Sequence, residues 1–197
     1  MHNNTPAPLL LCTIDLTTVC VDGSRIQLRS ISEAFAKPIF QEFSSEITHF
    51  MIPKPAETID ETFAFIRASI RGMEAKHEMI FAILAKDNEE FLGCCGIHGC
   101  VNHRTPEVGI WIKKSAHGQK LGREAVALAC QWALQTIDFD YLTYPVDRAN
   151  IPSRKIPESI GGVVFEETRV KTMRDTELDE VVYKISPESI RALAPVL

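Results

Sequence analysis

The segment of this chain best suited to chemistry is Ser115–Ala125, which carries glycines between a strand pattern and a helix pattern. Residues 106–112 alternate as a strand does, and residues from about 120 onward repeat as one face of a helix. Gly118 and Gly122 leave backbone N–H groups uncovered, and the first turn of a helix offers unpaired donors at the positive end of its dipole. The pattern predicts a turn that binds phosphate.

The spacing of the glycines excludes the two common nucleotide loops. A Walker loop requires Gly, four residues and then Gly-Lys-Ser/Thr, and a dinucleotide fingerprint requires Gly-x-Gly-x-x-Gly. Gly118-x-x-x-Gly122 satisfies neither.

The segment resembles instead the acyl-CoA loop of the GNAT acyltransferases, written Q/R-x-x-G-x-G/A. It is most similar to the form Q-G-K-G-Y-A-T-E-A of the ribosomal-protein N-acetyltransferase (RimJ/RimL-type) branch. His117 takes the Gln place, Gly118 matches, Lys120 replaces the central Gly, Gly122 takes the small-residue place, and Glu124-Ala125 match. Lys120 has a Cβ where the family keeps none, so it needs compatible backbone angles or displaces the pyrophosphate; its ammonium could also contact the phosphates.

A second block supports the resemblance. Asn150, Ser153, Glu158 and Gly161 match the family's N-x-x-S-x-x-x-x-E-x-x-G-F, with Gly162 in the Phe place. The two blocks imply an acyl-CoA-dependent N-acetyltransferase that moves an acetyl group from acetyl-CoA to a primary amine by direct attack in a ternary complex. The acceptor would be a small molecule or a protein N-terminus. The alternative, motivated by Lys120 and Pro157, is a non-catalytic acyl-CoA-binding or regulatory module.

The resemblance also implies which residues bind the cofactor. The strand that ends at the loop would supply main-chain N–H donors from Ile110, Trp111 and Ile112. The other expected contacts come from the loop and the second block: His117, Gly118, Gln119, Lys120, Leu121, Gly122, Arg123, Asn150 and Ser153.

The amine must lose a proton before it attacks, so a base is expected. Glu107 is the candidate, because it opens the strand and aligns with the Glu of the family's A-E-I-G-Y pattern; the alternative is a solvated or ion-paired surface residue. His98 and His103 are rivals, since an imidazole can accept a proton at neutral pH. Ser153 is the candidate proton donor to the leaving thiolate, and its alternative is an ordinary first-turn helix serine.

Two prolines bear on this site. Pro145 interrupts the pattern of residues 141–146 and cannot donate to a ladder, which fits either a splayed strand or an edge strand. Pro157 lacks the N–H that would bond the Ser153 carbonyl, so the helix after Asn150 is expected to kink or stop near Ile156.

Composition bounds the class of protein. With 197 residues and 45% hydrophobic content, we expect one domain over residues 19–197 after a loosely ordered leader, 1–18. A formal charge of −5 argues against a nucleic-acid partner. The absence of a signal-peptide pattern and of a long apolar run predicts a cytoplasmic protein with no membrane partner, its six cysteines reduced. A zinc site from Cys94, Cys95, His98 and Cys100 is disfavoured because adjacent strand residues face opposite ways, so no metal is expected. A homodimer is compatible with the resemblance.

The order of elements indicates an α+β chain similar to the GNAT fold, with a mixed central sheet of about seven strands, about four flanking helices, and a splay at the cofactor site. Strands are expected near 21–30, 79–86, 91–101, 107–112, 141–146, 162–166 and 181–185, and helices at 32–43 (interrupted at Pro38), 57–74, 120–136 and after 150.

In this fold the acceptor groove would be lined by residues 42–55 and 167–181. Acidic residues outnumber cations in and beside these segments, which favours a cationic acceptor such as a protein N-terminus, a lysine or a polyamine. The acids are Glu46, Glu57, Glu166, Glu167, Asp175, Glu177, Asp179 and Glu180, against Lys54, Arg169, Lys171 and Arg174.

Overall fold

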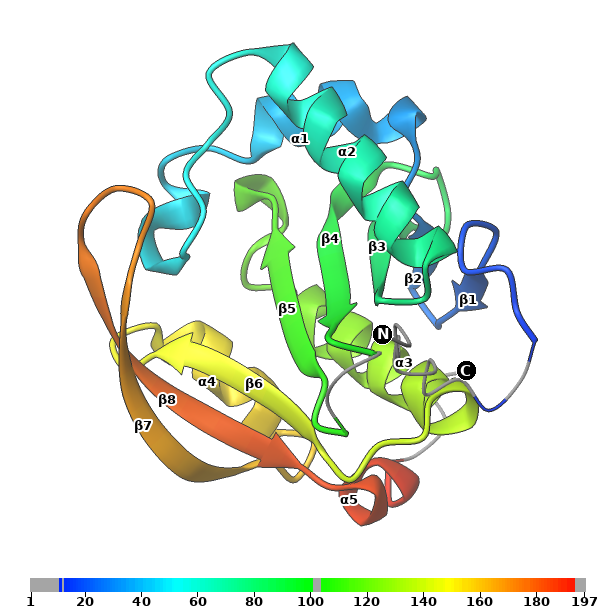
Figure 1. The fold of residues 1–197 in the computed structure, drawn as a ribbon, viewed down its shortest axis with the longest axis vertical. Helices are drawn as coiled ribbons and strands as arrows, with labels where there is room; N and C mark the ends of the chain where they lie inside the picture. The colour runs from blue at the N-terminus through cyan, green and yellow to red at the C-terminus, as the bar shows by residue number, and fades with distance from the viewer. Residues whose placement is uncertain (1–10, 12, 101–103, 194–197) are drawn as a thin grey trace, which may run out of the picture.

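The computed structural model of the protein describes residues 11, 13–100 and 104–193. Over these residues the chain forms one eight-stranded sheet with the order β1-β2-β3-β4-β5-β6-β8-β7, with α-helices on both faces (Figure 1). The described part has one strand and one helix more than expected: residues 20–30 form two strands joined by a turn, and α5 (Pro187–Arg191) follows the last strand. The mixed α+β arrangement of the GNAT fold is confirmed.

The first five strands pair antiparallel with their neighbours. They are β1 (Cys20–Asp22), β2 (Ile26–Ser30), β3 (Glu78–Ala85), β4 (Phe91–His98) and β5 (Glu107–Ile112). The central strands β3 and β4 are nearly continuous runs of buried residues, because helices cover both of their faces. The strands expected near 79–86, 91–101 and 107–112 are confirmed as a meander.

The remaining strands, which form the other part of the sheet, are β6 (Leu142–Asp147), β7 (Val163–Lys171) and β8 (Glu177–Ile185). The two parts of the sheet, β1 to β5 and β6 to β8, are joined by a single parallel pair, Glu107 with Thr143. Beyond this pair β5 and β6 diverge, as Figure 1 shows. The expected splay is therefore present.

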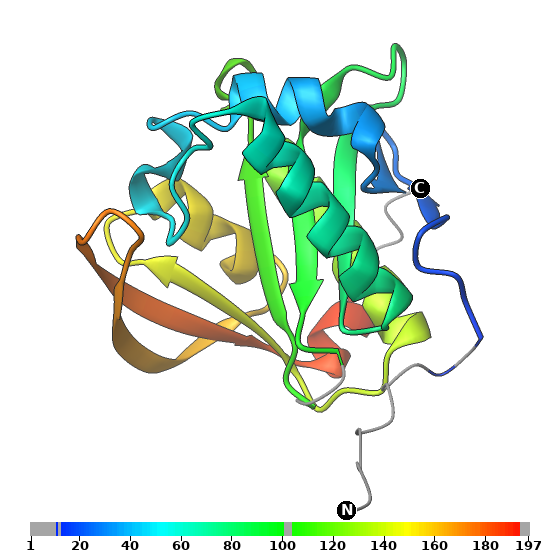
Figure 2. The same ribbon diagram turned by 45° about the horizontal axis from the view of Figure 1, so that its top comes forward.

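Two helices cover one face of the sheet and two others cover the opposite face (Figure 2). The first pair is α1 (Ala36–Glu42) and α2 (Ile59–Glu74); the second is α3 (Leu121–Thr136) and α4 (Ile151–Glu158). The α2 helix begins where its sequence predicts, because the Thr58 side chain accepts a hydrogen bond from the Glu61 N–H. The α3 helix is buried over most of its circumference against the sheet, where Trp132 packs edge-on against Phe81.

Two helices contain a proline at which an interruption was expected. The helix of residues 32–43 is not interrupted at Pro38: a 3₁₀ turn, Glu33–Phe35, precedes α1, and Pro38 lies in the first turn of α1, where its missing N–H costs nothing. The α4 helix, expected to kink or stop near Ile156, ends two residues later. It continues to Glu158 because the buried Pro157 sits in the last turn, where only one helical hydrogen bond is lost.

The packed structure begins before residue 19. Within the expected leader, Leu16 is only 1% exposed, and Ser30 Oγ donates to its carbonyl over 2.8 Å. Residues 13–18 thus belong to the folded unit.

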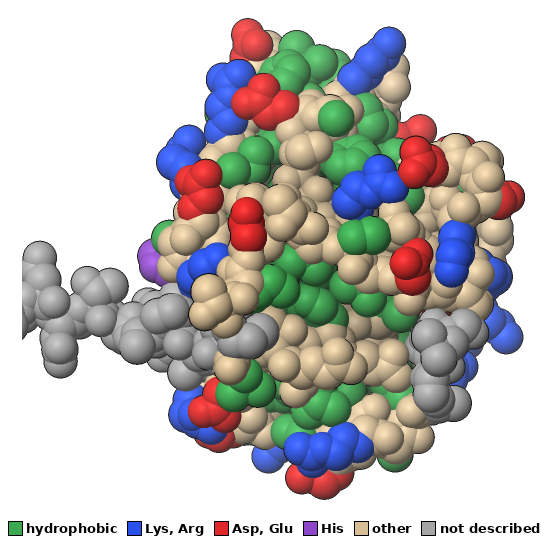
Figure 3. Space-filling model, turned by 90° about the vertical axis from the view of Figure 1, so that its right-hand side faces the viewer, with side chains coloured by type: hydrophobic (Ala, Val, Ile, Leu, Met, Phe, Trp, Pro, Cys, Tyr) green, Lys and Arg blue, Asp and Glu red, His purple; other side chains and the backbone are tan. Residues whose placement is uncertain are grey.

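The outer surface carries charges of both signs. On the side that bears β1, Lys and Arg alternate with Asp and Glu (Figure 3). None of the helices in the described residues is long and apolar enough to cross a membrane.

Candidate active site

The loop after β5 is shaped by its own histidine and glycine. His117 Nε2 lies 2.7 Å from the Ile112 carbonyl oxygen, which closes the turn formed by the 3₁₀ segment Lys114–Ala116. Gly118 then adopts φ 79°, a left-handed conformation that glycine accepts without strain. This contact gives His117 a part in shaping the loop.

Lys120 occupies the N-cap position of α3 in the left-handed region, at φ 62° and ψ 16°. It therefore has the backbone conformation that a glycine would have in its place, and the Cβ is accommodated at an energetic cost. Its side chain makes no capping hydrogen bond, so the first-turn N–H groups of α3 keep their capacity to bind an anion.

Gly122 lets α3 and α4 approach each other. A Cβ at Gly122 would lie 3.2 Å from Ile156 Cδ1, and Arg123 Nη2 donates to the Ser159 carbonyl over 3.4 Å. On the opposite side, Arg25 Nη1 donates to the Gln119 carbonyl over 3.0 Å and pairs with Glu124. The loop is thus fixed between α4 and the β1–β2 turn.

The edge of β5 presents main-chain groups to the gap. Because the Lys113 N–H bonds the Leu92 carbonyl of β4, the N–H groups of odd-numbered residues point toward β4 and those of Ile110 and Ile112 point toward β6. Of the three expected donors, Ile110 and Ile112 face the gap. Trp111 directs its N–H into the ladder and contributes its ring to the site instead.

Pro145 lies in β6, across the gap from β5. The Thr143 N–H bonds the Pro106 carbonyl and the Arg148 N–H bonds the Asp179 carbonyl. By alternation, the missing N–H of Pro145 is one that would point toward β5. Since β6 is flanked by β5 and β8, the edge-strand explanation of Pro145 does not apply.

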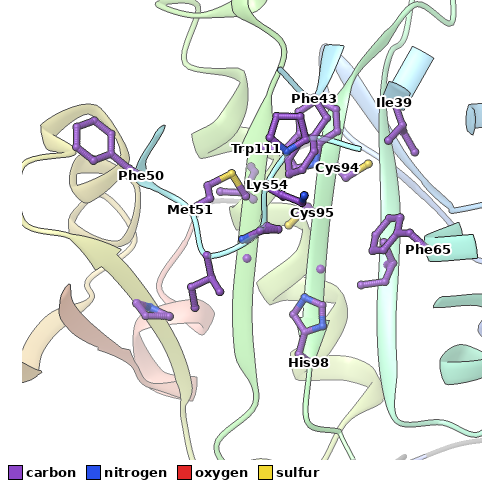
Figure 4. Close-up of a pocket in the computed structure, with 18 of the residues that line it drawn as sticks. Ile39, Phe43, Phe50, Met51, Lys54, Phe65, Cys94, Cys95, His98 and Trp111 are labelled. Carbon is purple, nitrogen blue, oxygen red and sulfur yellow. The ribbon is translucent and has the colours of Figure 1, made fainter. Parts of the chain in front are cut away.

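A cavity of about 560 Å³ passes through this gap. It is lined on the α4 side by Tyr144, Asn150 and Ser153, and on the α1/α2 side by His98 and Glu107. Figure 4 shows His98 projecting from β4 into this space, below the packed rings of Phe43 and Trp111. Both segments expected to form the acceptor groove reach the cavity, residues 50–55 from one side and Met173 and Glu180 from the other.

Glu107 lies next to His98 in a row that crosses three strands. Glu78 pairs with His98 in the β3–β4 register, and His98 pairs with Glu107 in the β4–β5 register. Glu78 Oε2 is 2.8 Å from His98 Nδ1, which leaves Nε2 for the cavity. The ring fits there only because residue 96 is glycine: a Cβ on Gly96 would lie 2.6 Å from Nε2.

Two carboxyl groups of the cavity hold their protons more tightly than usual. Reduced solvation raises the pKa of Glu107, and the nearby His98 opposes this rise. The Glu180 side chain is 7% exposed, and its pKa is raised first by burial and then by the negative charges of Glu107 and Asp147. Both groups can therefore accept and release a proton nearer neutral pH than an ordinary glutamate.

Ser153 is held between two polar neighbours. Its N–H donates to Asn150 Oδ1 over 3.3 Å, which is the expected N-cap contact, and its Oγ lies 2.8 Å from the Tyr144 hydroxyl. Burial raises the pKa of Tyr144, so the phenol is protonated at neutral pH. Pro157 leaves this geometry undisturbed.

Several residues of the site escaped the sequence patterns. Tyr144 and Glu78 reach the site through the pairing of distant segments, and Gly96 had no motif around it. The alternation of β4 places Gly96 and His98 on one face and is the signal that could have found Gly96. His103 lies outside the described residues. Cys94 and Cys95 line the cavity, but burial raises both thiol pKa values, that of Cys95 to about 12, which keeps the thiols protonated.

Comparison with known structures gives the same fold. RimJ of Mycobacterium smegmatis, solved with CoA-disulfide, is 14% identical with a TM-score of 0.78 and covers 92% of each chain. RimL, the ribosomal L7/L12 alpha-N-protein acetyltransferase solved with coenzyme A, is 12% identical with a TM-score of 0.77, over 85% of this chain and 98% of RimL. Ribosomal-protein-S5-alanine acetyltransferase of Vibrio fischeri is 15% identical with a TM-score of 0.74, over 86% of this chain and 97% of that chain.

A search of curated protein sequences gave no significant match. Residues 25–163, however, match the family model described as acetyltransferase (GNAT) domain, and this range spans most of the chain and includes both sequence blocks. The chain therefore belongs to the GNAT acetyltransferase family, whose members transfer an acetyl group from acetyl-CoA to an amine.

Proposed function

We propose that this protein acetylates a primary amine, with a protein N-terminus as one class of acceptor, and that Glu107 is the general base. The observation that carries the proposal is the single cavity that joins Ser153 on the α4 side to Glu107 and His98 on the α2 side through the splayed gap. The names of the neighbours RimL and ribosomal-protein-S5-alanine acetyltransferase support the N-terminal acceptor.

The cofactor would follow the gap. The pyrophosphate would bind the first turn of α3 and the loop His117–Arg123, and the pantetheine arm would lie beside Ile110 and Ile112. Their N–H groups would bond the arm and the thioester oxygen, so that the oxyanion formed during attack meets fixed donors.

Acetyl transfer then requires the nitrogen to lose two protons and the sulfur to gain one. Glu107, directly or through a water, accepts the proton that the ammonium must lose, and the neutral nitrogen attacks the thioester carbon. As the tetrahedral intermediate collapses, the C–S bond breaks and the thiolate takes a proton from Ser153. Tyr144 is placed to return that proton to Ser153 because their oxygens are 2.8 Å apart. The nitrogen loses its second proton to water as the amide forms, and water returns a proton to Tyr144, so the products are the amide, free CoA and the proton held by Glu107.

The test has two steps. Thermal shift with acetyl-CoA, CoA and ATP should show stabilisation by the CoA species only; at a concentration of 100 times Kd the gain is about 2.7 kcal/mol. Thiol release across amines and N-terminal peptides should then show turnover. If acetyl-CoA stabilises the protein but no acceptor gives thiol release, the protein is an acyl-CoA-binding module and the proposed enzymatic activity is excluded.

We also place the protein in the cytoplasm. Support comes from Cys94, Cys95, Cys100 and Cys130, which are free and buried in a form suited to a reducing compartment. Fractionation of the host cell tests this, and recovery from an oxidising compartment would contradict it.

A further inference from the structure

The α1/α2 end of the cavity is apolar. Its lining there comes from α1, α2, the segment before α2 and the β7–β8 turn, and includes Phe40, Phe43, Phe50, Ile52, Phe65 and Met173. Four large hydrophobic residues that are exposed on the protein surface are gathered here: Phe40, Ile52, Phe65 and Met173, with exposures from 36% to 64%. Exposed apolar side chains concentrated around one cavity indicate a binding surface for an apolar group.

The acids that favoured a cationic acceptor lie mostly outside this space. Glu46 is paired with Lys114 at 2.5 Å and Glu57 with Lys54 at 2.7 Å, and Glu167 is paired with Arg148 at 2.8 Å. Of the acids in the expected groove segments, only Glu180 lines the cavity. The excess of acid seen in the sequence therefore does not describe the acceptor site.

The negative charge that remains is confined to one place. The carboxylates on the cavity are Glu61, Glu107 and Glu180, and Glu61 already accepts the Glu57 N–H over 2.9 Å. Glu107 and Glu180 interact electrostatically and lie beside the gap. This arrangement suits one ammonium group at the gap, because the remaining carboxylate, Glu61, already interacts with Lys54, a cation that lines the same end of the cavity.

We infer that the acceptor is a primary amine carried on a large apolar group, with Phe65, Phe40 and Met173 selecting that group. The inference rests on the proposed function and names its substrate class. The apolar group comes either from a free monoamine or from the first side chain of a peptide, and the same chemistry recognises both. A polyamine would bury a second charge against apolar residues, which is costly, and a Ser or Ala N-terminus would leave the wall unfilled.

The experiment measures kcat/KM by thiol release at saturating acetyl-CoA. The acceptors are phenethylamine, peptides that start with Phe or Met, the same peptides starting with Ser or Ala, and spermidine. Filling the apolar wall should favour phenethylamine or the Phe and Met peptides at least tenfold over the other acceptors. Turnover of phenethylamine identifies a free monoamine as the acceptor, and turnover of the Phe or Met peptides identifies a peptide N-terminus.

The variant Phe65→Gln makes the test specific. Phe65 is 48% exposed on α2, so the substitution should leave folding and acetyl-CoA affinity intact while lowering kcat/KM for the apolar acceptors about tenfold through KM. Ile59→Gln is the matched control, because Ile59 is similarly exposed on the same helix and does not line the cavity.

The two levels of failure are distinct. Turnover of Ser, Ala or spermidine acceptors at rates equal to or above the apolar ones overturns the inference and leaves the enzyme in place. An equal effect of Phe65→Gln and Ile59→Gln also overturns it. Absence of thiol release with every acceptor overturns the proposed function itself.

Discussion

Among individual residues, Glu107 is the base that we propose. It lines the cavity, desolvation raises its pKa although the residue is exposed, and its neighbour His98 is oriented by Glu78. The raised pKa of Glu107 has a defined sign: the carboxyl is protonated and inactive at low pH, and activity appears as pH rises through that pKa.

Glu107→Gln is therefore expected to lower kcat roughly 100-fold while acetyl-CoA affinity is unchanged. In the native enzyme, the acid limb of kcat/KM should lie above the pH range of an ordinary glutamate, and the variant should lose it. A pH series of thiol release with phenethylamine measures this limb, because the ammonium of a free alkyl amine titrates near pH ~10, whereas a peptide α-amino group titrates near pH ~8.

His98→Gln is the companion variant. Turnover and an acid limb that persist in Glu107→Gln but disappear in His98→Gln would transfer the role of base to the imidazole.

The left-handed backbone of Lys120 carries a measurable cost. A residue with a Cβ in this region is less stable than glycine by about 1 kcal/mol. We expect Lys120→Gly to raise the free energy of unfolding by about that amount in urea titration.

Lys155→Gly serves as the opposite control, because Lys155 is exposed inside α4, where glycine should cost about 1 kcal/mol. A loss of stability in Lys120→Gly would mean that the side chain contributes more than its backbone costs. Acetyl-CoA affinity measured on the same variant reports whether the ammonium contacts the phosphates.

At the scale of elements, the β7–β8 hairpin and the segment before α2 form an arch over the acceptor side. Arg174 donates to Thr48 Oγ1 over 2.9 Å and to the His49 carbonyl over 3.2 Å, and the Met173 N–H donates to the Ile52 carbonyl. Figure 1 shows the hairpin turn meeting this segment beyond the end of β6.

Removing the guanidinium should loosen the arch. Arg174→Ala is expected to raise KM for the acceptor about tenfold, since hydrogen bonds from a charged donor are lost, and to leave acetyl-CoA affinity unchanged. Faster amide exchange over residues 47–56 would accompany the change.

Arg169→Ala is the matched control on the same hairpin. Arg169 is an exposed residue paired only with Glu177 among the ion pairs of the described residues, and such pairs contribute little. If Arg174→Ala and Arg169→Ala have equal KM values for the acceptor, the arch does not contribute to acceptor binding.

For the whole molecule, local patterns were enough to predict the fold but not the contents of the cavity. The strand that ends in a glycine loop and the start of α2 both depend on sequence patterns a few residues long, and both were predicted. The placement of Tyr144 beside Ser153 depends on how β6 lies against α4, and Glu180 reaches the gap only through β8 pairing. The end of α4 was predicted near Ile156, and the helix continues to Glu158 because a proline in the last turn removes only one helical hydrogen bond.

The acidic excess of the β7–β8 hairpin is a second feature whose meaning could not be predicted from the sequence. Its charges were counted correctly, but Arg148 forms ion pairs with both Glu167 and Asp179 on the surface. Residue counts cannot show which side chains are paired. The sequence therefore favoured a cationic acceptor in general, such as a protein N-terminus, a lysine or a polyamine, whereas the cavity lining supports the apolar amine that we infer.

Pro145 also has a consequence for the speed of binding. Since residue 145 offers no N–H to β5, the strands cannot close the gap by pairing at that point, and no strand separation has to precede entry of the pantetheine arm. The observed association rate should then rise linearly with acetyl-CoA concentration in stopped-flow measurements, without a plateau. Pro145→Val restores the N–H donor. A plateau that appears only in this variant would show that the proline sets the rate at which acetyl-CoA binds.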